Sequence, residues 1–151
     1  ALVLLGVQQV RQWASVWAMA GLSAGGPPEI VSVALVRARL CETLGRARFG
    51  ADAAGELFLL GMCSTLDVIL DQPMERAIAS LPLSDRLRAA LIGESGTFRS
   101  VLDVAIARER GYWTSLPDML EQLRISNALL SVAYIDALKW AHQLTSDSAV
   151  A

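Results

Sequence analysis

The side chains in this sequence that could perform chemistry are few and scattered. A single histidine, His142, lies near the C-terminus of the 151 residues. A histidine-based metal site or a Ser-His-Asp triad would require it, but its neighbours Lys139 and Gln143 are typical of a solvated helix face. The sequence has no Cys-x-x-Cys pair, phosphate-binding glycine loop or Gly-x-Ser-x-Gly elbow. The residues by themselves therefore contain no complete catalytic motif.

Two carboxylates form the first candidate pair. Asp67 and Asp71 are one helical turn apart, so their oxygens could share a cation. The interpretation that we favour is structural: both lie on the solvated face of a central helix, and Asp71 caps a helix that begins at Pro73.

Arg37 and Glu109 form the second candidate pair. The helical wheel places Arg37 between Val33 and Cys41 on an apolar face, and it places Glu109 in line with Leu102, Ile106 and Trp113. Because a buried unpaired charge is costly, the two side chains are expected to meet in a bidentate contact. Asp136, on a face with Leu129 and Trp140, is the alternative acid. The competing interpretation is that Arg37 reaches solvent past its neighbours.

Charge gives no indication of nucleic-acid binding. The net charge is -2 and the isoelectric point is about 5.3, so the chain lacks the basic footprint of a nucleic-acid partner. The basic run over residues 37–48 could attract phosphate, but most of it is predicted to be the exposed side of a helix. Arg99, Asp103 and Arg110 are likewise expected on a solvent side.

These residues must be positioned by helices, because no alternating strand pattern occurs. Apolar periodicity, caps and breakers predict helices over residues 8–22, 28–46, 56–71, 73–80, 85–92, 97–112, 115–124 and 126–144. We expect an all-α fold, a compact bundle of about seven or eight helices. The helix over 56–71 is predicted to be central, with Gly61 allowing close approach of another helix. Ser84, Thr97 and Ser115 are the expected N-caps, and 46–55 is the expected loop.

Composition bounds the setting of the domain. The apolar fraction is 54%, but the longest uncharged run, residues 12–28, is interrupted by polar residues, glycines and prolines, so no membrane span is predicted. Cys41 and Cys63 are expected to be buried free thiols, which favours the cytoplasm. The run Leu2–Leu5 begins in mid-pattern, as in a fragment of a longer protein. We expect it to pack on the domain or on a second copy, so a homodimer is one possible state.

Four segments together resemble the HDOD domain, the HD-related output domain, in the version that follows EAL domains in bacterial cyclic di-GMP signalling proteins. They are Leu-Val-Arg-Ala-Arg-Leu-Cys-Glu-Thr-Leu (35–44), Leu-Phe-Leu-Leu-Gly-Met-Cys-Ser-Thr-Leu-Asp (57–67), Leu-Pro-Leu (81–83) and Glu-Arg-Gly-Tyr-Trp (109–113). The resemblance covers essentially the whole chain, residues 1–151, as a single HDOD-like domain that lacks the start of a full one. It implies a helical HD-like bundle.

The resemblance also implies that catalytic residues have been replaced. Ser64 and Thr65 stand where HD phosphohydrolases carry their adjacent His-Asp metal ligands, and the ligand on the preceding helix falls near Val33. None of these side chains can replace an imidazole and a carboxylate on a divalent cation. The expectation is a non-catalytic regulatory module without metal or cofactor, which acts through a protein partner or its own EAL domain. Arg37, one turn beyond Val33, would then supply positive charge where the cation is lost.

Two alternatives remain open at this stage. One is a divergent HD-type phosphohydrolase that uses Asp67, Asp71 and Glu109 in place of histidines. The other is a receptor for a small ligand or a nucleotide, with an arginine-lined cleft. The sequence names neither the partner nor the input signal.

Overall fold

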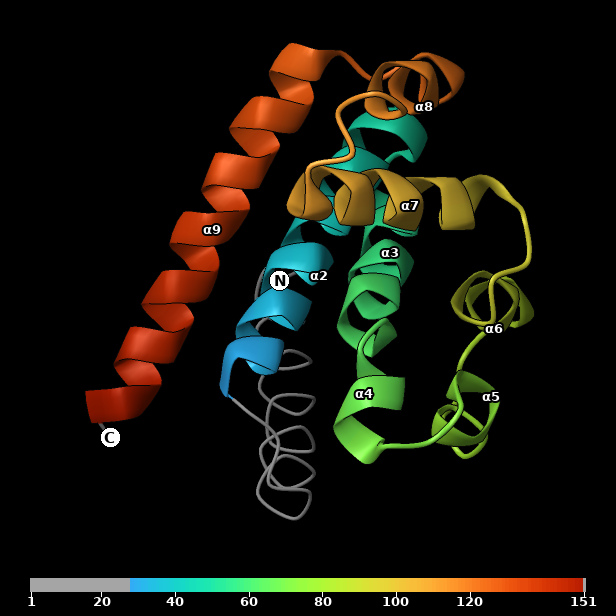
Figure 1. The fold of residues 1–151 in the computed structure, drawn as a ribbon, viewed down its shortest axis with the longest axis vertical. Helices are drawn as coiled ribbons and strands as arrows, with labels where there is room; N and C mark the ends of the chain where they lie inside the picture. Colours follow the sequence, from blue (N-terminus) through green and yellow to red (C-terminus); the bar gives the residue numbers. More distant parts are fainter. Residues whose placement is uncertain (1–27, 151) are drawn as a thin grey trace.

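The computed structural model describes residues 28–150, with side chains from 29 to 146, and within this range every regular element is a helix. This confirms the all-α prediction. The predictions for residues 1–27 lie outside the described residues. The elements, labelled as in Figure 1, are α2 (Pro28–Phe49), α3 (Ala51–Cys63), α4 (Leu66–Leu70), α5 (Met74–Ala77), α6 (Asp85–Leu91), α7 (Thr97–Arg110), α8 (Leu116–Leu123) and α9 (Asn127–Val150).

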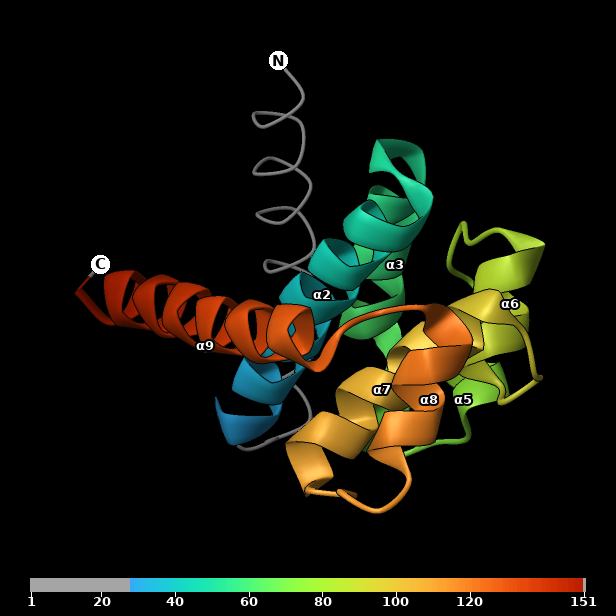
Figure 2. The same ribbon diagram turned by 90° about the horizontal axis from the view of Figure 1, so that it is seen from above.

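Helices α2 and α3 form the central pair, and α2 lies between α3 and α9 in both ribbon views (Figures 1 and 2). The pair is connected by Gly50 alone, whose φ of 91° suits a residue without a side chain. Where the two helices cross, a Cβ atom on Gly61 would lie 2.5 Å from the Cα atom of Ala38. The prediction that Gly61 permits close helix packing is therefore confirmed.

The remaining helices surround this pair. Helix α7 packs against both α2 and α3, with α8 on its outer side, and α6 contacts α3 and α7 (Figure 2). A continuous core fills the space between them. Its largest fully buried side chains include Leu40, Leu44, Leu57, Leu60, Met62 and Leu102. Because α2 and α7 both contribute to this core, any polar side chain on their inner faces needs a partner inside the fold.

The central helix differs from its prediction at both ends. The expected loop over residues 46–55 is wrong, because α2 continues to Phe49 and α3 begins at Ala51, with an exposed Gly55 inside it. The predicted continuous helix over 56–71 is also wrong, since α3 ends at Cys63 and α4 starts at Leu66. At this break the Ser64 hydroxyl donates to the Gly61 carbonyl over 2.7 Å. Serine and threonine side chains compete with the helical backbone in this way, and that competition places residues 64 and 65 in a kink.

Helix ends further along the chain are a mixture of confirmed and wrong predictions. The hydroxyl of Ser84 accepts from the Leu87 amide at the start of α6, as predicted. Thr97 is the first residue of α7 and Gly96 is its cap. The capping box at Ser115 is not formed, because its hydroxyl donates instead to the Tyr112 carbonyl. The helix expected over residues 73–80 is shorter than predicted, because α5 spans only Met74–Ala77.

The C-terminal end of α7 and the last helix also differ from expectation. Helix α7 stops at Arg110, because Gly111 adopts a left-handed conformation with φ 72°. Trp113, predicted to lie on the apolar face, is instead 60% exposed, with the Arg108 guanidinium over its ring. Helix α9 continues to Val150, past the expected end near Leu144.

Two further observations bear on the setting of the chain. By length and composition alone, the stretch Ala51–Leu70 could cross a membrane, but 61% of its 18-residue apolar window is buried within the fold, as in the core helix of a globular domain. Cys41 and Cys63 are unpaired and have no exposed surface. Burial raises the pKa of each thiol to about 12, so both stay protonated and unreactive near neutral pH.

Candidate functional site

A cavity of about 530 Å³ lies at the kink between α3 and α4, with further walls from α2 and α7. This volume is within the usual range of small-ligand sites. Its polar lining residues are Glu29, Arg37, Ser64, Thr65, Asp67, Arg99, Glu109 and Arg110, and its apolar ones are Ile30, Val33, Val68, Met74, Leu91, Leu102 and Ile106. Most residues singled out from the sequence, and Val33 with them, therefore share one cavity.

Arg37 and Glu109 form the bidentate ion pair predicted from their helix faces. Arg37 is 7% exposed, and its Nε atom donates to Glu109 Oε2 over 2.7 Å while Nη2 donates to Oε1 over 2.9 Å. The third guanidinium nitrogen, Nη1, donates to the Ser64 hydroxyl at 3.3 Å. This arrangement satisfies a buried charge through two parallel hydrogen bonds and joins α2, α7 and the kink.

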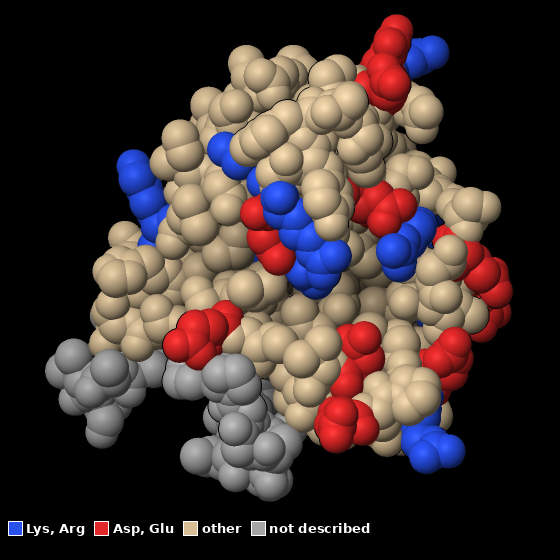
Figure 3. Space-filling model, viewed as in Figure 1, with Lys and Arg blue, Asp and Glu red and all other residues tan. Residues whose placement is uncertain are grey.

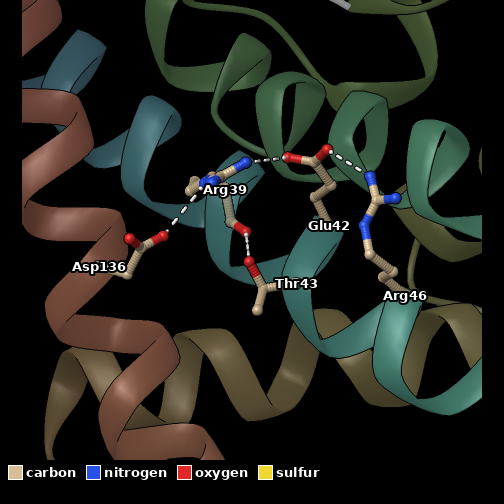
Figure 4. A network of polar contacts seen from close by, with 5 residues as sticks. All are labelled: Arg39, Glu42, Thr43, Arg46 and Asp136. Atoms are coloured by element: carbon tan, nitrogen blue, oxygen red, sulfur yellow. Dashed lines mark hydrogen bonds and ion pairs between the residues drawn. The ribbon is translucent and has the colours of Figure 1, made fainter. Parts of the chain in front are cut away.

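Asp136, the alternative acid for Arg37, belongs to a different network on the other side of α2 (Figure 4). It accepts from Arg39 Nε at 3.3 Å, and Arg39 Nη1 donates to Glu42 at 3.0 Å. Glu42 also accepts from Arg46 at 3.2 Å. Arg39 and Arg46 are therefore paired with carboxylates, whereas Arg48 donates to the Leu123 carbonyl over 2.9 Å. The Arg39–Asp136 contact links α2 to α9.

Ser64 and Thr65, the two neighbouring residues at the kink that the sequence resemblance singled out, have different surroundings. The Ser64 hydroxyl both donates to the Gly61 carbonyl and accepts from Arg37. Thr65 is 4% exposed, and its Oγ1 atom is buried without any hydrogen-bond partner. A buried hydroxyl with no partner costs free energy, so Thr65 is the most unusual polar group in the cavity.

Asp67 and Asp71 do not act together on the main cavity. Asp67 lines it, and its carboxylate makes no hydrogen bond or ion pair within the described part of the chain. Asp71 is the C-cap of α4 with φ 49°, and Pro73 takes the N-cap position of α5, so the predicted capping role of Asp71 is wrong. Both acids border a second, shallower hollow with Val68, Gln72 and Pro73. Among the described residues, no group of three or more His, Cys, Asp or Glu side chains could hold a metal ion.

Two arginines on α7 belong to the site although the sequence analysis assigned them to solvent. Arg99 donates to Asp103 over 2.8 Å and to the Ala90 carbonyl at the end of α6 over 3.0 Å. Arg110 lines the cavity but is exposed, as the sequence analysis expected, and its interaction with the Tyr112 side chain raises the arginine pKa. The steps of three and four residues from Arg99 through Leu102 and Ile106 to Glu109 and Arg110 were the available signal, because they mark one helix face.

The cavity is lined by equal numbers of acidic and basic side chains, but the two kinds differ in how many have a partner. Three acids and three arginines line it. Within the described residues all three arginines have partners, whereas Asp67 and Glu29 have none. Acidic and basic side chains are interspersed over the face drawn in Figure 3 and do not gather into a patch of one sign.

Comparison with known proteins gives two informative similarities. The chain is 31% identical over 147 residues to the uncharacterized protein YuxH of Bacillus subtilis. This alignment covers 95% of this chain and 35% of YuxH. It is 27% identical over 144 residues to the cyclic di-GMP phosphodiesterase CdgJ of Vibrio cholerae, covering 95% of this chain and 33% of CdgJ. The chain thus spans about a third of the length of the curated relatives that it matches. No family model matches it, and no solved structure does either.

Proposed function

We propose that this chain is an HDOD-type regulatory domain of a bacterial, cytoplasmic signalling protein linked to cyclic di-GMP. In this proposal the domain performs no catalysis, carries no metal or cofactor, and transmits a signal through contact with a protein partner or with an EAL domain of its own parent protein. The similarity to about a third of CdgJ, a cyclic di-GMP phosphodiesterase, supports the link to this nucleotide.

The arrangement of the kink carries the proposal. The resemblance to HDOD domains aligns Ser64 and Thr65 with the His-Asp ligands of HD phosphohydrolases. Both residues line one cavity with Val33, and the buried Arg37 guanidinium donates to Ser64. Hydroxyl and methyl groups bind a divalent cation poorly, and a fixed positive charge beside them repels one. The Arg37–Glu109 pair then does structurally what a bound cation would do, because it ties two helices to the kink.

The rival function is a divergent phosphohydrolase that uses Asp67, Asp71 and Glu109. Two observations weigh against it. Both oxygens of Glu109 accept from Arg37, and Asp71 lines the second hollow and not the main cavity. The three acids therefore lack a common centre, and a metal would have to displace a buried guanidinium from its partner, which is costly.

Metal content and turnover test the proposal directly. The purified chain should contain no stoichiometric iron, manganese or zinc by elemental mass spectrometry, and it should leave cyclic di-GMP intact after prolonged incubation with added Mn²⁺. The Asp67→Asn variant is the matched control, because it removes the one unengaged carboxylate of α4 without changing the shape of the side chain. One tightly bound metal per chain that is lost in Asp67→Asn, or hydrolysis abolished by that substitution, would favour the phosphohydrolase.

A further inference from the structure

The cavity at the kink contains polar groups that the fold itself does not use. The Thr65 hydroxyl is buried without a partner. The carboxylates of Asp67 and Glu29, on α4 and at the start of α2, make no hydrogen bond or ion pair with any described residue. A folded chain pairs nearly all of its buried polar atoms, so an unpaired hydroxyl in the wall of a cavity indicates a group that a ligand completes.

The arginines of the cavity, in contrast, are already occupied. Arg37 is held by Glu109 and Ser64, Arg99 by Asp103 and a backbone carbonyl, and Arg110 by Tyr112. An anionic ligand such as a nucleotide phosphate would have to compete with these contacts, and release of Arg37 would leave the Glu109 carboxylate unpaired in a partly buried position. The charge that remains available is therefore negative.

The rest of the lining is aliphatic. Val33 on α2, Val68 on α4, and Leu102 and Ile106 on α7 all face the same space. Val68 is 61% exposed, so its apolar side chain is accessible to a ligand in this space. A long cationic group matches a cavity that has both an aliphatic wall and unpaired carboxylates. Its hydrocarbon stem packs on the apolar surface while its charged head binds a carboxylate.

We propose that the cavity binds an ammonium or guanidinium group carried on an aliphatic stem. Asp67 and Glu29 accept from the cationic head, the Thr65 hydroxyl supplies a further hydrogen bond, and Val33, Val68 and Ile106 cover the stem. The inference rests on the proposed regulatory function, because a lysine or arginine side chain of a protein partner has this chemistry. A free diamine has it too, and the experiment below separates the two sources.

Nuclear magnetic resonance titration of the isotope-labelled 151-residue chain tests the site. The probes are N-acetyl-lysine N-methylamide for a side chain and cadaverine for a free diamine, with N-acetyl-norleucine N-methylamide as the uncharged match and cyclic di-GMP as the anionic one. We expect saturable shifts at the backbone amides of residues 64–68 with a cationic probe, and a dissociation constant on the order of a millimolar, as befits so small a ligand. Tighter binding of the lysine probe assigns a protein side chain, and tighter binding of cadaverine assigns a free amine.

Substitutions then locate the contact. Asp67→Asn should weaken binding at least about tenfold, because it removes the charge and keeps the shape. Asp71→Asn is the matched control, since that acid lies one turn further on and does not line this cavity, and it should leave the affinity unchanged. Thr65→Val should also weaken binding but should not lower the melting temperature, because it removes a hydroxyl that has no partner in the fold.

The inference fails on any of three results. Saturation by neither cationic probe, equal effects of Asp67→Asn and Asp71→Asn, or binding of cyclic di-GMP at residues 64–68 in preference to the cations would each overturn it. These results differ from those that would overturn the proposed function. A chain that is free of metal, inactive on cyclic di-GMP and indifferent to both cations would remove this site and leave the regulatory proposal in place.

Discussion

The contact between α2 and α3 at Gly61 offers a quantitative test of the fold. A Cβ atom at this position would lie 2.5 Å from both the Cα and the N atoms of Ala38, and 2.6 Å from the carbonyl carbon of Arg37. Carbon atoms in contact prefer separations of about 3.5–4.0 Å, so Gly61→Ala requires the helices to move apart by about 1 Å. No rotamer change can relieve this clash, because the atoms that it meets belong to the backbone.

The expected loss follows from two opposing terms. Overpacking a core costs about 1–3 kcal/mol, and a clash with backbone belongs at the upper end of that range. Alanine returns about 1 kcal/mol through its better helix propensity. We expect Gly61→Ala to lower the free energy of unfolding by about 2 kcal/mol and to lower the melting temperature by several degrees. Because Arg37 adjoins the clash, the shifts in the nuclear magnetic resonance spectrum should extend to Ser64.

Gly55 provides the matched control in the same helix. It is exposed, and a Cβ atom there would meet nothing within 4 Å. Gly55→Ala should therefore stabilise the chain by about 0.5–1 kcal/mol through propensity and the reduced entropy of the unfolded state. Urea denaturation monitored by circular dichroism measures both variants. Equal stability of Gly61→Ala and Gly55→Ala would refute the close approach of the two helices.

Two further predictions concern the buried polar groups. Arg37→Met and Glu109→Leu should each destabilise by about 3 kcal/mol, and the double variant should recover much of that loss, because the pair leaves together; additive losses in urea denaturation would mean that the side chains do not meet. Burial raises the pKa of Cys41 and Cys63 from 9.0 to about 12 in the folded chain. Between these two pH values the thiols ionise only in the unfolded chain, so the free energy of unfolding should fall as the pH rises from about 9 towards 12. The expected slope is about 1.4 kcal/mol per pH unit for each thiol. A Cys41→Ala/Cys63→Ala variant should show a flatter alkaline limb in urea denaturation, and an unchanged limb would contradict the assignment.

The relative positions of charges on single helices follow from the sequence, because helical periodicity fixes which residues share a face. Arg37 among Val33 and Cys41, and Glu109 in line with Leu102, could each be recognised as a charge on an inward face. The requirement that buried charges pair then predicted their contact. Gly61 was similarly informative, since a glycine inside an apolar helix pattern needs a packing reason.

The competition between a side chain and the helical backbone, which ends a helix locally, was harder to predict. The apolar pattern runs without interruption through residues 64 and 65, yet the Ser64 hydroxyl takes the Gly61 carbonyl and the helix ends there. The register of Trp113 was extrapolated past Gly111, whose left-handed conformation turns the chain outward. Periodicity measures which face a residue would occupy if the helix continued, and it contains no information on where side chains or glycines terminate the helix.

The tertiary structure alone decided the character of the site. The sequence identifies Arg99 and Arg110 as charges on a helix, and Asp103 lies four residues from Arg99 on the same helix. Only the packing of α6 against α7, however, shows that the Ala90 carbonyl also binds Arg99. It also shows that Thr65 lacks a partner and that Asp67 faces a cavity. Composition and spacing fix which charges are present and which helix face they share. Which of them remain available to a ligand depends on groups brought together from distant parts of the chain, and the fold alone determines those contacts.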